Sequence, residues 1–159
     1  MKDKLNRYLD EYLKPVRASY CAFEDMACGM AMPQEDIYSY IDENKKEGTF
    51  QTLLFKHIDS KNLKDSDVYN KVNIDRRLFS KIRSNKNYHP SKETIILLGI
   101  ALELNEKEIE ELLDIASYSL PYNNEYDLII RFCFKEKIYD INQINEFLYD
   151  HNCKLLGGE

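Results

Sequence analysis

The sequence predicts an all-α protein whose helical core lies between residues 49 and 159. Apolar residues recur there at intervals of three and four, which is the period of a helix with one buried face. Asp, Asn or Ser precedes most of these periodic stretches, where its side chain can accept hydrogen bonds from the free amides of a first helical turn. The alternation of apolar and polar residues that marks a strand persists nowhere in the chain. We therefore expect helices alone.

The N-terminal part is predicted to contain one helix and a connection. Residues 1–14 carry Leu and Tyr at helical spacing, which predicts a short amphipathic helix that Pro15 ends. Residues 15–48 mix small residues, Met, Tyr and a polar run without any period. We expect this stretch to be a mostly irregular linker.

Seven further helices are predicted from residue 49 onward, each from an apolar stripe that follows a capping residue. Between the second and the third, Asn73 can take the left-handed conformation that a tight helix end requires. Pro121 separates the fifth helix from the sixth. The predicted starts are, in order, residue 49, Asp65 or Ser66, Asp75, Ser91, Asn105, residue 124 and Asp140.

Composition limits the class of protein. At 159 residues, 43% hydrophobic and 31% charged, the chain can bury one core and carry an appendage. No apolar stretch approaches the roughly 18 residues that a membrane span needs. The N-terminus is charged throughout and lacks the apolar core of a signal peptide. Its four cysteines have neither disulfide-framework nor zinc spacing, so we expect free thiols in a reducing compartment. The expected location is the cytoplasm.

A basic segment interrupts this acidic chain. Residues 73–92, "NIDRRLFSKIRSNKNYHPSK", hold six Lys or Arg and one acid, although the formal net charge of the chain is −6. Two short helices joined by a sharp turn at Asn73 form a helix-turn-helix unit, whose second helix enters the major groove of DNA. The segment therefore predicts a nucleic-acid interface.

The expected DNA contacts follow from helical geometry. Arg76 and Arg77 stand in the first turn of the second helix, where an Arg fork can reach guanine O6 and N7. Other cations would sit against phosphates and set the register. The alternative is a solvated basic face that only balances nearby acids. The residues assigned to DNA are Arg76, Arg77, Ser80, Lys81, Arg83, Ser84, Lys86 and Lys92.

Residues 49–117 resemble the lambda-repressor-like helix-turn-helix domains, the Xre and Cro/CI class of bacterial and phage regulators. The resemblance rests on "DSDVYNKVNIDRRLFSKIRSNK" and on "YHPSKETIILLGIALEL". It implies a five-helix domain, here extended by two C-terminal helices, in which Val68 and Ile74 hold the two helices together. It also implies a sequence-specific regulator of transcription that binds double-stranded DNA.

Some positions depart from the pattern of this family. Tyr69 stands where the family usually has a small residue under the recognition helix, so its ring needs a wider crossing or an outward orientation. Asn73 replaces the usual Gly of the turn, which is a mild change. Asp65 and Asp67 stand at a helix start that commonly touches phosphate, and carboxylates repel phosphates.

The helices predicted within residues 124–156 exceed the five-helix unit. Regulators of this class generally dimerise to read two half-sites about 34 Å apart. These helices can therefore form a homodimer face, or they can simply cap the core.

The chain also resembles a narrower group of uncharacterised bacterial Xre-like proteins. That resemblance raises a second function, an adaptor or sensor in a stress-response or phage-defence operon that contacts protein or RNA. In the linker, "MACGMAMP" is soft and unbranched, and Met26, Met30 and Met32 can dock in a groove of a protein partner. The alternative is a disordered tether.

The sequence contains no constellation that predicts catalysis. His57, His89 and His151 lie far apart, with no pairing of nucleophile and base nearby. The phosphate-binding glycine motif and the zinc-protease motif are both missing from the sequence. We expect no enzyme activity, no cofactor and no bound metal.

Overall fold

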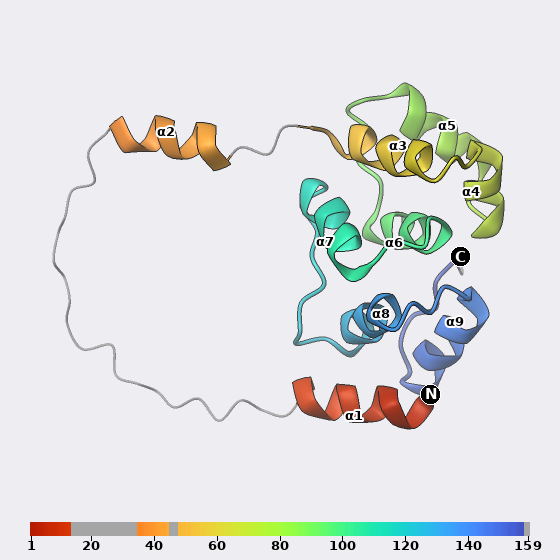
Figure 1. Cartoon of the computed structure of the whole chain (residues 1–159). Coiled ribbons are helices and arrows are strands. Elements are labelled where there is room, and N and C mark those ends of the chain that lie inside the picture. Colours follow the sequence, from red (N-terminus) through yellow and green to blue (C-terminus); the bar gives the residue numbers. More distant parts are fainter. Residues whose placement is uncertain (14–34, 45–47, 158–159) are drawn as a thin grey trace, which may run out of the picture. The chain divides into compact units, whose positions relative to one another are not determined.

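The computed structural model describes residues 1–13, 35–44 and 48–157, and all regular structure in these ranges is helical (Figure 1). The all-α prediction is confirmed. No helix in these ranges combines the length and the apolar character that crossing a membrane requires. The helices are α1 (Lys2–Leu13), α2 (Glu35–Asn44), α3 (Phe50–Ser60), α4 (Asp65–Lys71), α5 (Arg76–Ser84), α6 (Lys92–Ala101), α7 (Glu106–Ile115), α8 (Glu125–Lys135) and α9 (Ile141–Asp150).

Capping side chains define most helix starts in the main unit, which comprises Met1–Lys14 and Gly48–Glu159. Asn105 accepts hydrogen bonds from the amides of Lys107 and Glu108, and the Glu108 carboxylate accepts one from the Asn105 amide, which completes a capping box. The same kind of side-chain cap begins five other helices, at Thr49, Asp75, Ser91, Asn124 and Asp140. The helix starts that the sequence predicts therefore agree with the structure.

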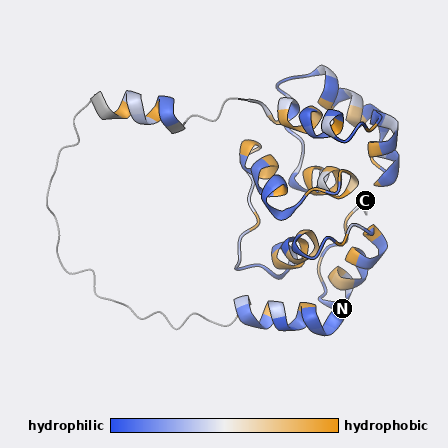
Figure 2. Cartoon of the chain, in the orientation of Figure 1, coloured by the Kyte–Doolittle hydropathy of each residue, from blue (hydrophilic) through white to orange (hydrophobic). Residues whose placement is uncertain are grey.

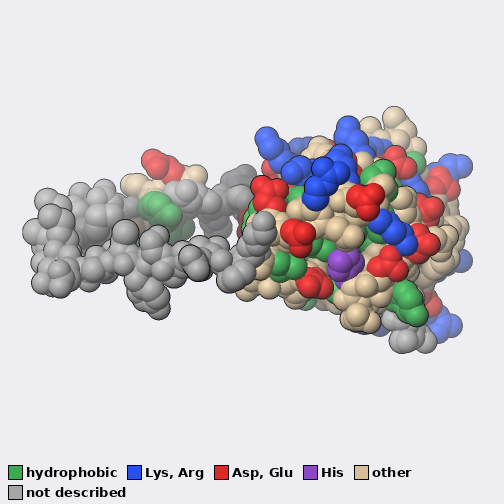
Figure 3. Space-filling view, turned by 90° about the horizontal axis from the view of Figure 1, so that it is seen from below, with side chains coloured by type: hydrophobic (Ala, Val, Ile, Leu, Met, Phe, Trp, Pro, Cys, Tyr) green, Lys and Arg blue, Asp and Glu red, His purple; other side chains and the backbone are tan. Residues whose placement is uncertain are grey.

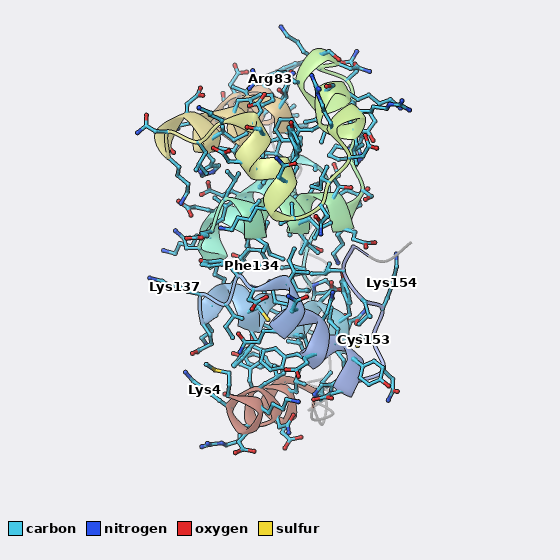
Figure 4. All side chains as sticks on the ribbon, turned by 90° about the vertical axis from the view of Figure 1, so that its right-hand side faces the viewer. Lys4, Arg83, Phe134, Lys137, Cys153 and Lys154 are labelled. Atoms are coloured by element: carbon cyan, nitrogen blue, oxygen red, sulfur yellow. The ribbon has the colours of Figure 1, made fainter. Side chains whose placement is uncertain are left out.

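The helices of the main unit form successive tiers. Figure 4 shows α3, α4 and α5 at one end, α6 and α7 in the middle, and α8, α9 and α1 at the other end. Apolar residues lie on the facing sides of these helices (Figure 2), and residues 95–101 of α6 are all buried. Gly99 makes the close packing of α6 possible, because a Cβ there would lie 2.5 Å from Cδ1 of Ile109 and 3.1 Å from Cζ of Phe134.

Helix α8 is buried on all sides because α1, α7 and α9 surround it. The N-terminal helix contributes Leu5, Tyr8 and Leu9 to this contact, and the rings of Tyr8 and Phe132 lie 5.3 Å apart. The apolar residues of α8 therefore pack within the protein, as the capping alternative predicted. A homodimer through residues 124–156 stays a prediction, and its interface would have to use residues other than the buried apolar residues of α8.

The second unit, Pro15–Glu47, contains a helix that was not predicted from the sequence. It is α2, which lies within the stretch expected to be mostly irregular. Three of its apolar side chains, Ile37, Tyr38 and Ile41, are 54%, 76% and 48% exposed. The predicted partner-binding residues Met26, Met30 and Met32 lie outside the described residues.

Two described cysteines are free thiols with different surroundings. Burial raises the pKa of Cys133 to about 12, and burial followed by the nearby Glu125 carboxylate raises the pKa of the half-buried Cys153. Since the thiolate is the reactive form, Cys133 should resist alkylation by iodoacetamide at pH 8 in the folded protein, whereas Cys153 reacts. Peptide mapping by mass spectrometry measures both rates, and 6 M urea should make them equal. Equal rates in the folded protein would contradict the prediction.

Candidate nucleic-acid interface

Residues 65–84 form two short helices joined by a sharp turn. Asn73 takes the left-handed conformation predicted for it, with φ of 53°, and the amide of Ile74 donates to the carbonyl of Tyr69 at 2.9 Å. The Asp75 carboxylate then accepts a hydrogen bond from the Arg77 amide and begins α5. The buried residues that hold α4 against α5 are Val68, Val72, Ile74, Phe79 and Ile82.

Helix α5 presents a polar side away from this core. Phe79 and Ile82 are only 3% and 2% exposed and define the buried side. The hydroxyl of Ser84 donates to the Ser80 carbonyl at 2.8 Å, so it stays close to the helix. The predicted site residues Arg76, Arg77, Ser80, Lys81 and Ser84 are all exposed, as is Lys86 just beyond the helix.

Most of the cations that have no ion pair among the described residues lie on or beside α3, α4 and α5. On α1, by contrast, Lys2 and Lys4 pair with Asp150 and Glu136, and Figure 3, which views the molecule from the α1 side, shows basic and acidic side chains intermixed. Within the described ranges, some basic residues have neither an ion pair nor a side-chain hydrogen bond. Those on or beside α3, α4 and α5 are Lys56, Lys61, Lys64, Arg76, Arg77, Lys81 and Lys86. Those elsewhere are Arg7, Lys107, Lys135 and Lys137.

Arg83, a predicted phosphate contact, is engaged within the protein. Its Nη2 lies 2.5 Å from Oδ1 of Asp65, and its guanidinium carbon lies 4.2 Å above the ring of Phe55. Its backbone carbonyl accepts a hydrogen bond from the Gln51 side chain. Arg83 thus joins α5 to α3 and α4 at the end of the molecule marked by its label in Figure 4. The same pair balances Asp65, one of the two carboxylates expected to repel phosphate.

Lys92, another predicted phosphate contact, also has an internal partner. Its Nζ lies 2.6 Å from Oδ1 of Asp127, whose side chain is only 4% exposed. Because an unpaired buried carboxylate is costly, this ion pair is required where α6 meets α8. We therefore leave Lys92 out of the candidate interface.

A groove runs between α4 and α5. Tyr69 is half-buried, and its ring packs 5.7 Å from the ring of Phe79, which is how the structure accommodates a large residue at this position. The rim of the groove carries the cationic side chains of Lys64, Arg76 and Arg83. We call this feature the α4–α5 groove, and its lining residues are Lys64, Asp65, Ser66, Tyr69, Arg76, Phe79, Ser80 and Arg83.

The most elaborate ionic cluster among the described residues was not predicted from the sequence. Arg131 is only 6% exposed, binds the carboxylates of Glu106 and Glu110, and donates to the carbonyl of Leu120 at 2.8 Å. Its guanidinium carbon lies 4.3 Å over the ring of Tyr122. A single Arg inside the apolar run "LIIRFCF" is the signal that could have revealed it. The cluster connects α7 and α8.

The described residues contain no group of His, Cys, Asp and Glu that could hold a metal ion. The candidate interface consists of the exposed side of α5 with Lys86, and of the α4–α5 groove beside it. Comparisons of the chain with protein-family models, with curated proteins and with solved structures each gave no match.

Proposed function

We propose that the protein binds double-stranded DNA through the exposed side of α5 and acts as a sequence-specific regulator of transcription. The observation that carries the proposal is that Arg76, Arg77, Lys81 and Lys86, on and just beyond α5, have no acidic partner among the described residues, in a chain whose net charge is −6. Within the described ranges, seven of the nine cations on or beside α3, α4 and α5 have no ion pair, whereas five of the nine cations elsewhere pair with acids of the chain itself. Cations without an acidic partner on one short helix can bind the phosphates of DNA. Each bound phosphate releases condensed counterions from the DNA, which favours binding.

The geometry of α5 supports this assignment. An α-helix with its side chains is about 10–12 Å across, which fits a major groove roughly 12 Å wide, and the nine residues of α5 extend about 13 Å along it. Arg76 and Arg77 occupy the N-terminal turn, the part of a recognition helix that meets base edges. Lys81 and Lys86 follow along the exposed side and would bind phosphates.

Replacement of Arg76 and Arg77 by alanine is expected to weaken binding to a selected duplex by roughly 30-fold or more, since each forked Arg–guanine contact contributes about 1–3 kcal/mol. The duplex is one enriched from a random pool by the native protein. Fluorescence anisotropy at two salt concentrations measures the loss, and log affinity of the native protein should fall by about 0.9 per log salt for each phosphate neutralised.

The matched control carries Arg7→Ala with Lys107→Ala. These are unpaired, exposed cations on α1 and α7, so the control makes the same change in net charge away from α5. It should keep affinity within about threefold, because distant surface charges are screened at ordinary salt. Equal losses in the two double variants would contradict the role of α5.

A second candidate function is the protein-contacting adaptor, which the exposed apolar side chains of α2 favour. Copurification from the native host would return a stable protein partner. Ile37→Ser with Ile41→Ser should abolish that copurification, whereas the Arg76 and Arg77 substitutions should leave it intact. The reverse result would favour the DNA-binding function.

A further inference from the structure

Helix α2 combines an apolar side with a strong negative charge. Its ten residues include four acids and no base. Ile37 and Ile41 are four positions apart and share one side of the helix, with Tyr38 and Asp42 at its edge, whereas Glu43 falls on the opposite side. Isolated helices this short are marginal in water, and apolar side chains this exposed mark contact surfaces. A binding site for α2 should therefore be an apolar groove with basic residues at its rim.

The α4–α5 groove has this chemistry. Tyr69 and Phe79 are its aromatic lining residues, and Lys64 and Arg76 at the same groove have no ion pair within the described ranges. The carboxylate of Asp65, an acid on the rim, is already bound by Arg83. The groove therefore presents net positive charge beside its aromatic lining residues.

We propose that α2 of one copy of the protein docks in the α4–α5 groove of a second copy. Ile37 and Ile41 would pack on Tyr69 and Phe79, and the Asp42 carboxylate at the edge of the apolar side would meet the basic rim. This is helix-in-groove recognition, in which side chains one turn apart anchor an amphipathic helix. The complementary charges of the two surfaces select this occupant, since a second α2 would bring together two helices of the same charge.

Docking has a regulatory consequence that rests on the proposed function. Arg76 lines the groove and also belongs to the exposed side of α5 assigned to DNA. It cannot contact α2 and a base edge at the same time. Docked α2 therefore competes with DNA, and rising protein concentration would favour self-association over DNA binding.

The test uses a labelled peptide of residues 34–44 and the full chain carrying Ile37→Ser with Ile41→Ser, so that the peptide has no competing α2 in the preparation. Fluorescence anisotropy at 50 mM salt should show saturable binding. Arg76→Glu in the full chain should weaken it at least tenfold, and the same two Ser substitutions in the peptide should do likewise. Arg77→Glu makes the same charge change on α5 outside the groove, and it should weaken binding less than threefold.

Lack of saturable binding, or equal losses with Arg76→Glu and Arg77→Glu, would overturn the inference. Sedimentation velocity of the native chain should also show association that rises with concentration and disappears in the Ile37→Ser, Ile41→Ser variant. A native chain that stays monomeric at millimolar concentration would overturn docking between copies. The DNA assay separates the two proposals: peptide binding without DNA binding contradicts only the proposed function, and DNA binding without peptide binding contradicts only this inference.

Discussion

Replacing Arg131 by alanine is expected to lower the free energy of unfolding by about 3 kcal/mol. The change removes the partner of Glu106 and Glu110, leaves the Leu120 carbonyl without its donor, and exposes a face of Tyr122. The value lies at the lower end for a broken buried ion pair, because the two Glu side chains are 34% and 44% exposed and recover part of their hydration. Urea denaturation followed by circular dichroism measures the loss.

The guanidinium of Arg131 stays protonated at all ordinary pH values. Burial opposes the charged form, but the hydrogen bonds to Glu110 and Glu106 outweigh it and raise the pKa of Arg131 above its ordinary value. The destabilisation should therefore be the same at pH 6 and pH 9. Lys107→Ala, at an exposed cation on α7, serves as the control and should cost less than 0.5 kcal/mol. A loss below about 1 kcal/mol for Arg131→Ala would show that the cluster adds little.

Features that depend on neighbouring residues could be predicted from the sequence. The caps at Asp75, Asn105 and Asp140 act within one helical turn, so the residue types alone place the helix starts. The left-handed turn at Asn73 follows from the same local chemistry. Exposure of Arg77 is equally local, because Phe79 and Ile82 fix which side of α5 is buried.

Features that depend on distant residues could not be predicted. Arg83 meets Asp65, 18 positions away, and Lys92 meets Asp127, 35 positions away, so their pairing requires the arrangement of whole helices. In the sequence all these cations look alike. Two of the eight residues predicted to contact DNA, Arg83 and Lys92, therefore form ion pairs within the protein instead.

The contact between α1 and α8 explains why the sequence could not decide whether α8 forms a dimer face or packs within the chain. The apolar residues of α8 exceed what one neighbour can cover, which predicts either a dimer face or further packing in the same chain. The structure places α1 there, with the Tyr8 ring on Phe132, 124 positions along the chain. Sequence spacing carries no information on a contact of that separation.

Phe132→Ala is expected to lower the free energy of unfolding by about 4 kcal/mol, since it opens a cavity at a residue only 1% exposed, in the layer between α1 and α8. Tyr8→Ala removes the opposite ring. Because the two rings touch, the double variant should be less destabilised than the sum of the single ones by about 1 kcal/mol. Urea denaturation of the native chain and the three variants completes the cycle.

Tyr149→Ala is the matched control for the loss of an aromatic ring, because Tyr149 lies on α9 and is 74% exposed. It should change stability by less than 0.5 kcal/mol and should be additive with Phe132→Ala. If Phe132→Ala does not fold, Phe132→Leu keeps most of the volume and should still couple to Tyr8→Ala. Strict additivity between positions 8 and 132 would mean that α1 does not pack on α8 in solution, and the apolar surface of α8 would then be free for another occupant.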